Sequence, residues 1–262
     1  MKIEDKTDSL KKSAQYEVTV FGVDGSITCC EDELICEHFM DIYINDELLD
    51  TVSCTPDDLL ELAVGRLFFE GIIVCDPYCE YISIDEDGRR ASVYLTKEVK
   101  DVDSLKNQGI REFATDDPDH NEVDKYSDNG GDISGFDEDY KEIIFRLANK
   151  FTEDTELHKN TKGSHICYLY TDNGEIRVFE DISRYNIIYK AIGYTILNNI
   201  DSKKCVVFIT GRVSCGMVKK IVKAGFPVLI SKAVPYYEAA VLANSLGLKL
   251  VCKAWPDSYV RY

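Results

Sequence analysis

Two loops in the C-terminal half carry residues that suit an anionic ligand. The first follows a short apolar run and contains Gly211, Arg212 and Ser214, directly before a helical pattern. Glycine allows a tight turn, a guanidinium offers a fork of donors, and the first turn of a helix attracts anions. The second loop begins at Ser231 and offers Lys232 as another cation. Ligands bind beyond the carboxyl ends of the strands in open α/β sheets, so these loops predict a site for a small phosphorylated ligand.

Two further segments can contribute to this site. His165 stands at the start of an apolar run. Residues 180–186 follow a hairpin and open a helix, where Asp181 can cap while Arg184 and Asn186 reach a ligand. Simpler alternatives stay open: a histidine at the start of a strand, a helix cap with a surface ion pair and, in the first loop, a surface arginine with a capping serine.

The elements that must position these residues alternate regularly. Short apolar runs predict strands, and amphipathic stretches between them predict helices. The expected strands are 165–171, 175–179, 205–210, 227–231 and 248–252, and the expected helices are 187–196, 214–223 and 236–246. Strands that are almost wholly apolar and alternate with amphipathic helices indicate an α/β fold, a parallel sheet with helices on both faces.

The N-terminal half predicts a smaller α+β portion. Residues 41–52 read as a hairpin around an Asn-Asp turn, and residues 81–95 as a second hairpin. Between them Thr55 is the expected N-cap of a helix, and Gly71 is placed to end it. The predicted organisation is a flexible tail (1–15), an N-terminal α+β portion (16–110), an acidic loop or disordered insertion (111–139) and a C-terminal α/β domain (140–262).

The chain of 262 residues is strongly acidic. It has 30 Lys+Arg against 47 Asp+Glu, a formal net charge of −17, and ten of the acids fall in residues 116–139 beside one lysine. Such a charge repels phosphate, which excludes binding to nucleic acid or an anionic membrane through bulk electrostatics. A local basic pocket can still take one phosphorylated ligand. No run approaches the ~18 apolar residues of a membrane helix, and we expect a cytoplasmic protein.

Five motifs together resemble the formate dehydrogenase accessory sulfurtransferase family (FdhD/NarQ). Residues 53–73, SCTPDDLLELAVGRLFFEGII, are similar to the most specific signature of that family. The other matches are TKGSH at 161–165, EDISRYN at 180–186 followed by Lys190, TGRVS at 210–214 with MVKK at 217–220, and GFPVLIS at 225–231.

The resemblance implies a fold akin to the cytidine deaminases, a homodimer, and sulfur transfer from a cysteine desulfurase to the molybdenum cofactor of formate dehydrogenase. It also implies that the guanine-nucleotide part of the cofactor, or a GDP- or GTP-like nucleotide, binds in the pocket formed by these motifs. The candidate cofactor-binding residues are then Thr161, Gly163, His165, Asp181, Arg184, Asn186, Gly211, Arg212, Ser214 and Lys232.

The chain departs from the family in its cysteines. The resemblance implies a persulfide carried on a Cys-x-x-Cys loop, but residues 96–139, where that loop should fall, contain no cysteine. A persulfide carrier needs a thiolate, which neighbouring carboxylates disfavour. Cys215, at a helix start beside Arg212, is a weak substitute with an expected lowered pKa, and plain packing is its alternative. Cys54, just before the expected N-cap Thr55, is the second candidate, and a structural role is its alternative. Sulfur transfer is therefore expected to be degenerate.

Three functions follow in order of preference. The first is an accessory protein that binds molybdenum cofactor or a guanine nucleotide, with formate dehydrogenase apoenzyme and a cysteine desulfurase as partners. The second is a scaffold whose acidic segment engages a basic partner. The third, a deaminase-like hydrolase, needs a His/Cys/Cys zinc set, and the ten cysteines offer no spacing that builds one, so no metal site is predicted.

Overall fold

The computed structural model describes residues 1–7, 9–72, 79–96, 136–153 and 155–262. Most of the predicted acidic insertion lies outside these ranges. The N-terminal half contains β1 (Lys2–Asp5), β2 (Ser13–Phe21), β3 (Ile27–Ile35), β4 (His38–Ile44), β5 (Glu47–Cys54), α1 (Leu59–Phe69), β6 (Cys79–Ile84) and β7 (Arg90–Leu95). The C-terminal half contains α4 (Phe136–Thr152), α5 (Glu156–Thr161), β8 (His165–Tyr170), β9 (Ile176–Asp181), α6 (Asn186–Leu197), η1 (Ser202–Lys204), β10 (Val206–Ile209), α7 (Cys215–Lys223), β11 (Val228–Ser231), α8 (Tyr237–Ser245), β12 (Lys249–Cys252) and β13 (Val260–Arg261).

A five-stranded sheet in the order β1-β6-β7-β4-β5 forms the N-terminal half. Both expected hairpins are present, and the turn between β4 and β5 has Asn45 and Asp46 in the left-handed region, with φ of 48° and 68°. Residues 2–5, predicted to belong to a flexible tail, are instead strand β1, which pairs in parallel with β6. The edge of β6 offers unpaired backbone groups, and β1 satisfies them.

Helix α1 begins three residues later than predicted. Asp58 is its N-cap with a left-handed φ of 46°, whereas the expected cap, Thr55, is buried. Thr55 Oγ1 accepts a hydrogen bond from the Ile182 backbone N–H at 3.1 Å. A buried hydroxyl must find a partner, and here the partner comes from the other half of the chain. Gly71, with φ 82°, follows the end of the helix as expected.

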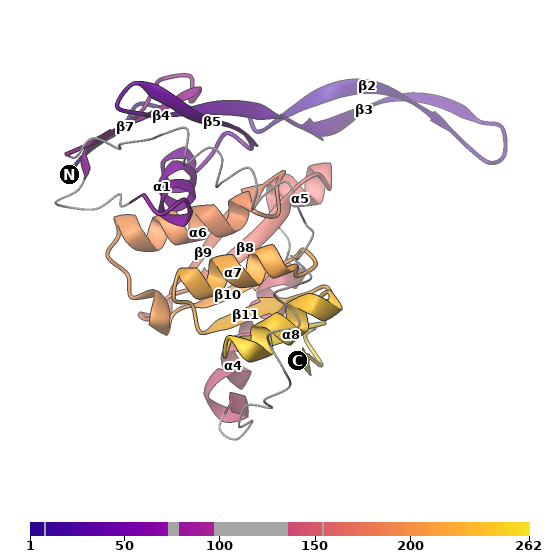
Figure 1. Cartoon of the computed structure of the whole chain (residues 1–262). Helices are drawn as coiled ribbons and strands as arrows, with labels where there is room; N and C mark the ends of the chain where they lie inside the picture. The colour runs from indigo at the N-terminus through magenta and orange to yellow at the C-terminus, as the bar shows by residue number, and fades with distance from the viewer. Residues whose placement is uncertain (8, 73–78, 97–135, 154) are drawn as a thin grey trace.

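Strands β2 and β3 form a separate two-stranded antiparallel sheet, which we call the arm (residues 13–35). Figure 1 shows the arm projecting well beyond the rest of the molecule, in line with β4 and β5. Its base is tied to the body near α5, where a Cβ on Gly163 would lie 2.7 Å from Ile35 Cγ2.

The C-terminal sheet has six strands in the order β13-β12-β11-β10-β8-β9. Strands β10, β11 and β12 are parallel, as predicted, but β8 runs antiparallel to β10, so the sheet is mixed. Helices α6, α7 and α8 cover one face, and α4 covers the other through Ile144, Leu147 and Ala148. The prediction of an α/β sheet with helices on both faces is confirmed.

Helix α4 begins at Phe136, within the range predicted for the acidic insertion. Among the helices of the described residues, none has the length and apolar character needed to cross a membrane.

Candidate functional site

The two predicted loops meet at the carboxyl edge of the C-terminal sheet and are joined there. Ser231 Oγ donates a hydrogen bond to the Gly211 carbonyl at 2.7 Å. Backbone bonds add to this link: Val213 N–H donates to the Val234 carbonyl at 3.2 Å, and Tyr236 N–H donates to the Val213 carbonyl at 2.9 Å. The loops that follow β10 and β11 therefore form one connected ledge.

His165 and Arg184 converge beside Gly211 on this ledge. A Cβ on Gly211 would lie 3.5 Å from Arg184 Cβ and 3.6 Å from His165 Nδ1. Both side chains are half-buried. Burial, followed by the positive charges of Arg184 and His158, lowers the pKa of His165, so its ring is neutral at pH 7. The structure thus brings together three of the predicted residues, drawn from β8, the start of α6 and the loop after β10.

Ser214 lies at the start of α7, as predicted, and it is 2% exposed. Its Oγ is 3.0 Å from the Tyr185 hydroxyl, and no side-chain cap bond is formed at this helix start. Tyr185 in turn packs against the buried Lys220, whose Nζ is 4.9 Å from the centre of the tyrosine ring. Neither Tyr185 nor Lys220 was among the predicted site residues, because their places depend on packing between α6 and α7.

Arg212 and Lys232 extend the site outward. Arg212 is exposed and lies over the Tyr236 ring, 5.6 Å from its centre. Lys232 is half-buried between Phe151, at 4.0 Å from the ring centre, and Trp255, at 5.1 Å. Both cations pack against aromatic rings, which restricts the side-chain conformations while the charge stays at the outer edge of the ledge.

Asp181 lies beneath the ledge and is fully buried. Its carboxylate accepts hydrogen bonds from Thr55 N–H at 3.1 Å, Ser183 N–H at 2.9 Å and Asn186 Nδ2 at 2.9 Å. The ammonium of Lys190, also fully buried, is 2.9 Å from the same carboxylate. We call these residues the Asp181 cluster. Its polar atoms are satisfied by the protein, so Asp181 and Asn186 support the site from below.

Lys190 is the cation of this cluster. Its Nζ is 2.7 Å from Asp57 Oδ1 and donates to the Glu180 carbonyl at 2.8 Å. Burial alone would lower the pKa of Lys190, but the carboxylates of Asp181 and Asp57 outweigh burial and raise it. The cluster therefore joins the segment before α1 to the start of α6.

Thr161 and Gly163 lie at the end of α5, at the base of the arm. Thr161 Oγ1 donates to the Leu157 carbonyl at 2.8 Å and accepts from Gly163 N–H at 3.1 Å. Close by, Ser164 Oγ donates to Glu180 Oε1 at 3.0 Å. These two predicted residues shape the turn that leads into His165, and their polar atoms serve that turn.

The substitute thiol does not have the expected character. Cys215 is half-buried, and burial together with the nearby Glu238 raises its pKa, whereas a lowered pKa was expected beside Arg212. Arg212 is drawn instead to Tyr236. Cys54 is no better placed, because burial and the Asp181 charge raise its pKa to about 12. Within the described residues, no group of His, Cys, Asp and Glu side chains could hold a metal ion.

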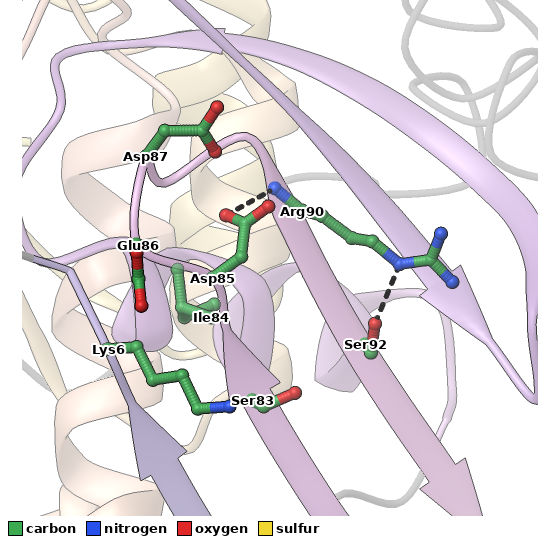
Figure 2. A pocket seen from close by; sticks show the side chains of 8 residues that line it. All are labelled: Lys6, Ser83, Ile84, Asp85, Glu86, Asp87, Arg90 and Ser92. Carbon is green, nitrogen blue, oxygen red and sulfur yellow. Dashed lines mark hydrogen bonds between the residues drawn. The ribbon is translucent and has the colours of Figure 1, made fainter.

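A hollow of about 510 Å³ lies elsewhere, at the tip of the β6–β7 hairpin. Figure 2 shows Lys6, Asp85, Glu86, Asp87 and Arg90 around it. Its lining has three carboxylates, Asp85, Glu86 and Asp87, and the Arg90 guanidinium is already bound to Ser92 Oγ at 3.0 Å and Asp46 Oδ1 at 3.2 Å, so the hollow does not suit an anionic ligand. We therefore place the candidate site at the ledge.

The comparisons with known proteins agree with the motifs. The model of the FdhD/NarQ family matches residues 35–262. The chain belongs to the FdhD/NarQ family. Among its FdhD relatives, the sulfur carrier protein FdhD of Bacillus pumilus is 28% identical over 239 residues, with 87% of each chain covered. The protein of the same name from Wolinella succinogenes is 28% identical over 226 residues, covering 84% of this chain and 77% of its own.

The FdhD/NarQ fold is also seen in a solved structure. A formate dehydrogenase accessory protein from Desulfotalea psychrophila superposes with a TM-score of 0.73, at 24% identity and with 96% of both chains covered. At this identity the likeness shows the fold alone, and it confirms the predicted fold class.

Proposed function

We propose that this protein acts in the maturation of formate dehydrogenase by binding the guanine-nucleotide end of molybdenum cofactor, or a free guanine nucleotide, at the ledge. The names of its relatives, sulfur carrier and formate dehydrogenase accessory protein, support the process. The observation that supports a ligand at the ledge is that His165 and Arg184 converge on the space beside Gly211.

The donors at the ledge suit phosphate oxygens. Arg184 and Arg212 offer guanidinium forks, Lys232 an ammonium, and the start of α7 its free backbone N–H groups. Asp181, the acid beneath, does not repel an anion because Lys190 neutralises it. In this proposal Arg184 and the α7 N-terminus bind one phosphate, and Arg212 neutralises the charge of a second phosphate. The neutral ring of His165 donates a hydrogen bond to the ligand or accepts one from it.

Sulfur transfer through the usual loop is degenerate in this proposal. Residues 96–139 contain no cysteine, and the thiol nearest the ledge, Cys215, has a raised pKa. A raised pKa leaves less thiolate to attack a desulfurase persulfide. What remains is binding of the cofactor and its presentation to formate dehydrogenase.

Nucleotide titration tests the binding. Isothermal calorimetry with GDP is expected to give micromolar affinity, and Arg212→Ala is expected to weaken it at least about tenfold because charge-assisted bonds to phosphate are lost. Arg89→Ala is the matched control, since Arg89 is also exposed but lies on the β6–β7 hairpin and pairs with Asp87. If GDP gave no binding heat and did not shift the melting temperature, nucleotide binding would be excluded. The scaffold function, in which the acidic segment engages a basic partner, would then remain.

Sulfur loading tests the second half of the proposal. The protein is incubated with a cysteine desulfurase and cysteine, and its intact mass is then measured. The expected mass is unchanged. A stable adduct of one sulfur atom on any cysteine would show that another thiol carries the persulfide sulfur. It would overturn the claim that sulfur transfer is degenerate.

The proposed partners are formate dehydrogenase apoenzyme and a cysteine desulfurase, in the cytoplasm. We include a homodimer in this proposal.

A further inference from the structure

The arm has two unlike faces. In the β2–β3 register Tyr16 faces Asp32, Val18 faces Cys30 and Val20 faces Thr28, and directly paired residues share a face. The apolar face of the arm consists of Ala14, Tyr16, Val18, Val20, Cys30 and Leu34, with Thr28 and Asp32. The opposite face, called the polar face here, carries Gln15, Glu17, Thr19, Cys29, Glu31 and Glu33 along its middle and is apolar only at its ends, with Phe21 and Ile27 at the tip and Ile35 at the base.

The apolar face is uncovered. Tyr16 is 62% exposed, Val20 52% and Leu34 43%. At the base of the arm it is Ile35, on the polar side, that meets α5 of its own chain. The apolar side is therefore turned away from the body there. A lone two-stranded hairpin is marginally stable in water, so an arm of this length needs a surface to lie on.

Charge indicates which surface that is. Residues 13–35 contain five Asp or Glu and no Lys or Arg, whereas residues 201–257 contain nine Lys or Arg and three Asp or Glu. Residues 201–257 are thus net basic, with cations on α7 and in the loops, while α8 carries no Lys or Arg. Exposed cations there include Lys203 on η1 and Lys219 and Lys223 on α7, and Lys223 Nζ donates to the Phe69 carbonyl. Helix α8, which packs on α7, adds the exposed side chains of Tyr237 (77%) and, at its C-terminal end, Leu246 (38%). We call these five residues the α7–α8 surface.

The arm cannot reach this surface on its own chain. Figure 1 shows the arm leaving the molecule above α5 and extending away from α7 and α8. The same two surfaces can meet between two copies, and a two-fold exchange uses both at once. We propose that the arm of one copy lies, apolar face inward, across the α7–α8 surface of a second copy.

The contact area supports an exchange between two copies. Nine residues per strand make the arm about 30 Å long, and a two-stranded ribbon about 10 Å wide covers about 300 Å² of a partner. One arm on an unrelated protein then buries about 600 Å² in total, below the size of a stable interface, whereas a reciprocal exchange buries about 1,200 Å², at its lower limit. A ribbon one layer thick also keeps its carboxylates within about a Debye length, ~8 Å, of the cations beneath it.

This inference rests on the proposed homodimer and not on nucleotide binding, so the two proposals fail separately. Sedimentation velocity of the full chain across micromolar concentrations is expected to show a reversible dimer. Val20→Lys places a charge on the apolar face and is expected to raise the dimer dissociation constant at least about tenfold. Thr19→Lys is the matched control: it adds the same charge one residue away, on the opposite face, and is expected to leave dimerisation nearly unchanged.

Charge reversal identifies the surface that the arm touches. Glu31→Lys with Asp32→Lys reverses the arm, and Lys203→Glu with Lys219→Glu reverses the α7–α8 surface. Each double variant alone is expected to dimerise weakly. An equimolar mixture is expected to recover a dimer, because the reversed arm of one copy meets the reversed surface of the other while the second contact is native.

Several outcomes would overturn the inference. One is a chain that stays monomeric at every concentration, and another is a dimer that tolerates Val20→Lys or loses affinity equally with Thr19→Lys. If mixing the two charge-reversed variants did not restore the dimer, the α7–α8 surface would be excluded as the surface that the arm contacts. Circular dichroism of each variant checks that the body is folded, and GDP titration of the same samples keeps the ligand question apart.

Discussion

Gly65 of α1 and Gly193 of α6 allow these two helices to cross with their backbones in contact. A Cβ on Gly65 would lie 1.9 Å from the Tyr189 carbonyl oxygen, and a Cβ on Gly193 would lie 1.9 Å from the Glu61 carbonyl oxygen. No side chain fits at either position. The crossing joins the N-terminal sheet to the helices that carry the ledge.

We expect Gly193→Ala to destabilise the protein by about 3 kcal/mol or more, because the added methyl group must push the helices apart. Chemical denaturation measures this change. Gly216→Ala is the control in another helix, since its Cβ would meet nothing nearer than 3.5 Å, and there the higher helix propensity of alanine should keep stability equal or raise it. Equal losses at both positions would show that the crossing is not tight.

Lys190→Met is expected to cost about 3–5 kcal/mol, because it leaves the carboxylates of Asp181 and Asp57 without their buried cation. Lys12 also pairs with Asp57, at 2.7 Å, but it is half-exposed. Lys12→Met should therefore cost no more than about 1 kcal/mol. A comparable loss in both variants would contradict the Asp181 cluster as a buried support.

The same cluster predicts a dependence on alkaline pH. Folding raises the pKa of Lys190, so its stabilisation is present below the ordinary lysine pKa of about 10.4 and is lost as pH rises through the folded value. The difference in unfolding free energy between wild type and Lys190→Met should shrink above about pH 10.5. A difference that stays constant up to pH 11.5 would count against the ion pair.

His165 predicts a pH dependence of ligand binding. Its pKa is lowered, so the ring is neutral at pH 8 and gains a proton only below about pH 6.5. A phosphate bound beside it favours the charged ring, and GDP affinity should rise as pH falls from 8 to 6. His165→Asn should remove that part of the pH profile while the titration of the nucleotide itself persists. Identical slopes in the two proteins would place His165 outside the binding site.

Cysteine reactivity follows burial and pKa. With iodoacetamide at neutral pH, the exposed Cys29 and Cys30 should be alkylated first, and Cys215, with its raised pKa, should react slowly and faster at higher pH. The buried Cys167 is the internal control and should stay unmodified in the native protein. Peptide mass spectrometry follows each site. If Cys215 reacted before Cys29, its proposed inertness would be wrong.

Local patterns were sufficient to predict most of the C-terminal elements. The apolar runs and helical spacing place α7 within one residue of its observed start, because its signals are short in range. The loops after β10 and β11 also meet as expected, since parallel neighbours end at one edge of a sheet.

Features that depend on distant residues could not be predicted in this way. Thr55 looks like a helix cap, yet it contacts Ile182 and Asp181, more than 120 residues away. Strand β8 pairs antiparallel with β10, and an apolar run has the same pattern in either direction, so periodicity could not predict it. Tyr185 and Lys220 enter the site only through the packing of α6 on α7.

The Asp181 carboxylate receives its donors from both halves of the chain, including the Thr55 backbone and Lys190. The halves are therefore not interchangeable modules. If an unrelated domain replaced residues 1–96, the buried Asp181 carboxylate would lose the hydrogen bond from the Thr55 N–H, and water could not replace it. The ledge would then lose part of its support. Variation in the N-terminal sheet is thus constrained by the same residue that underlies the site, and the two parts must be inherited together.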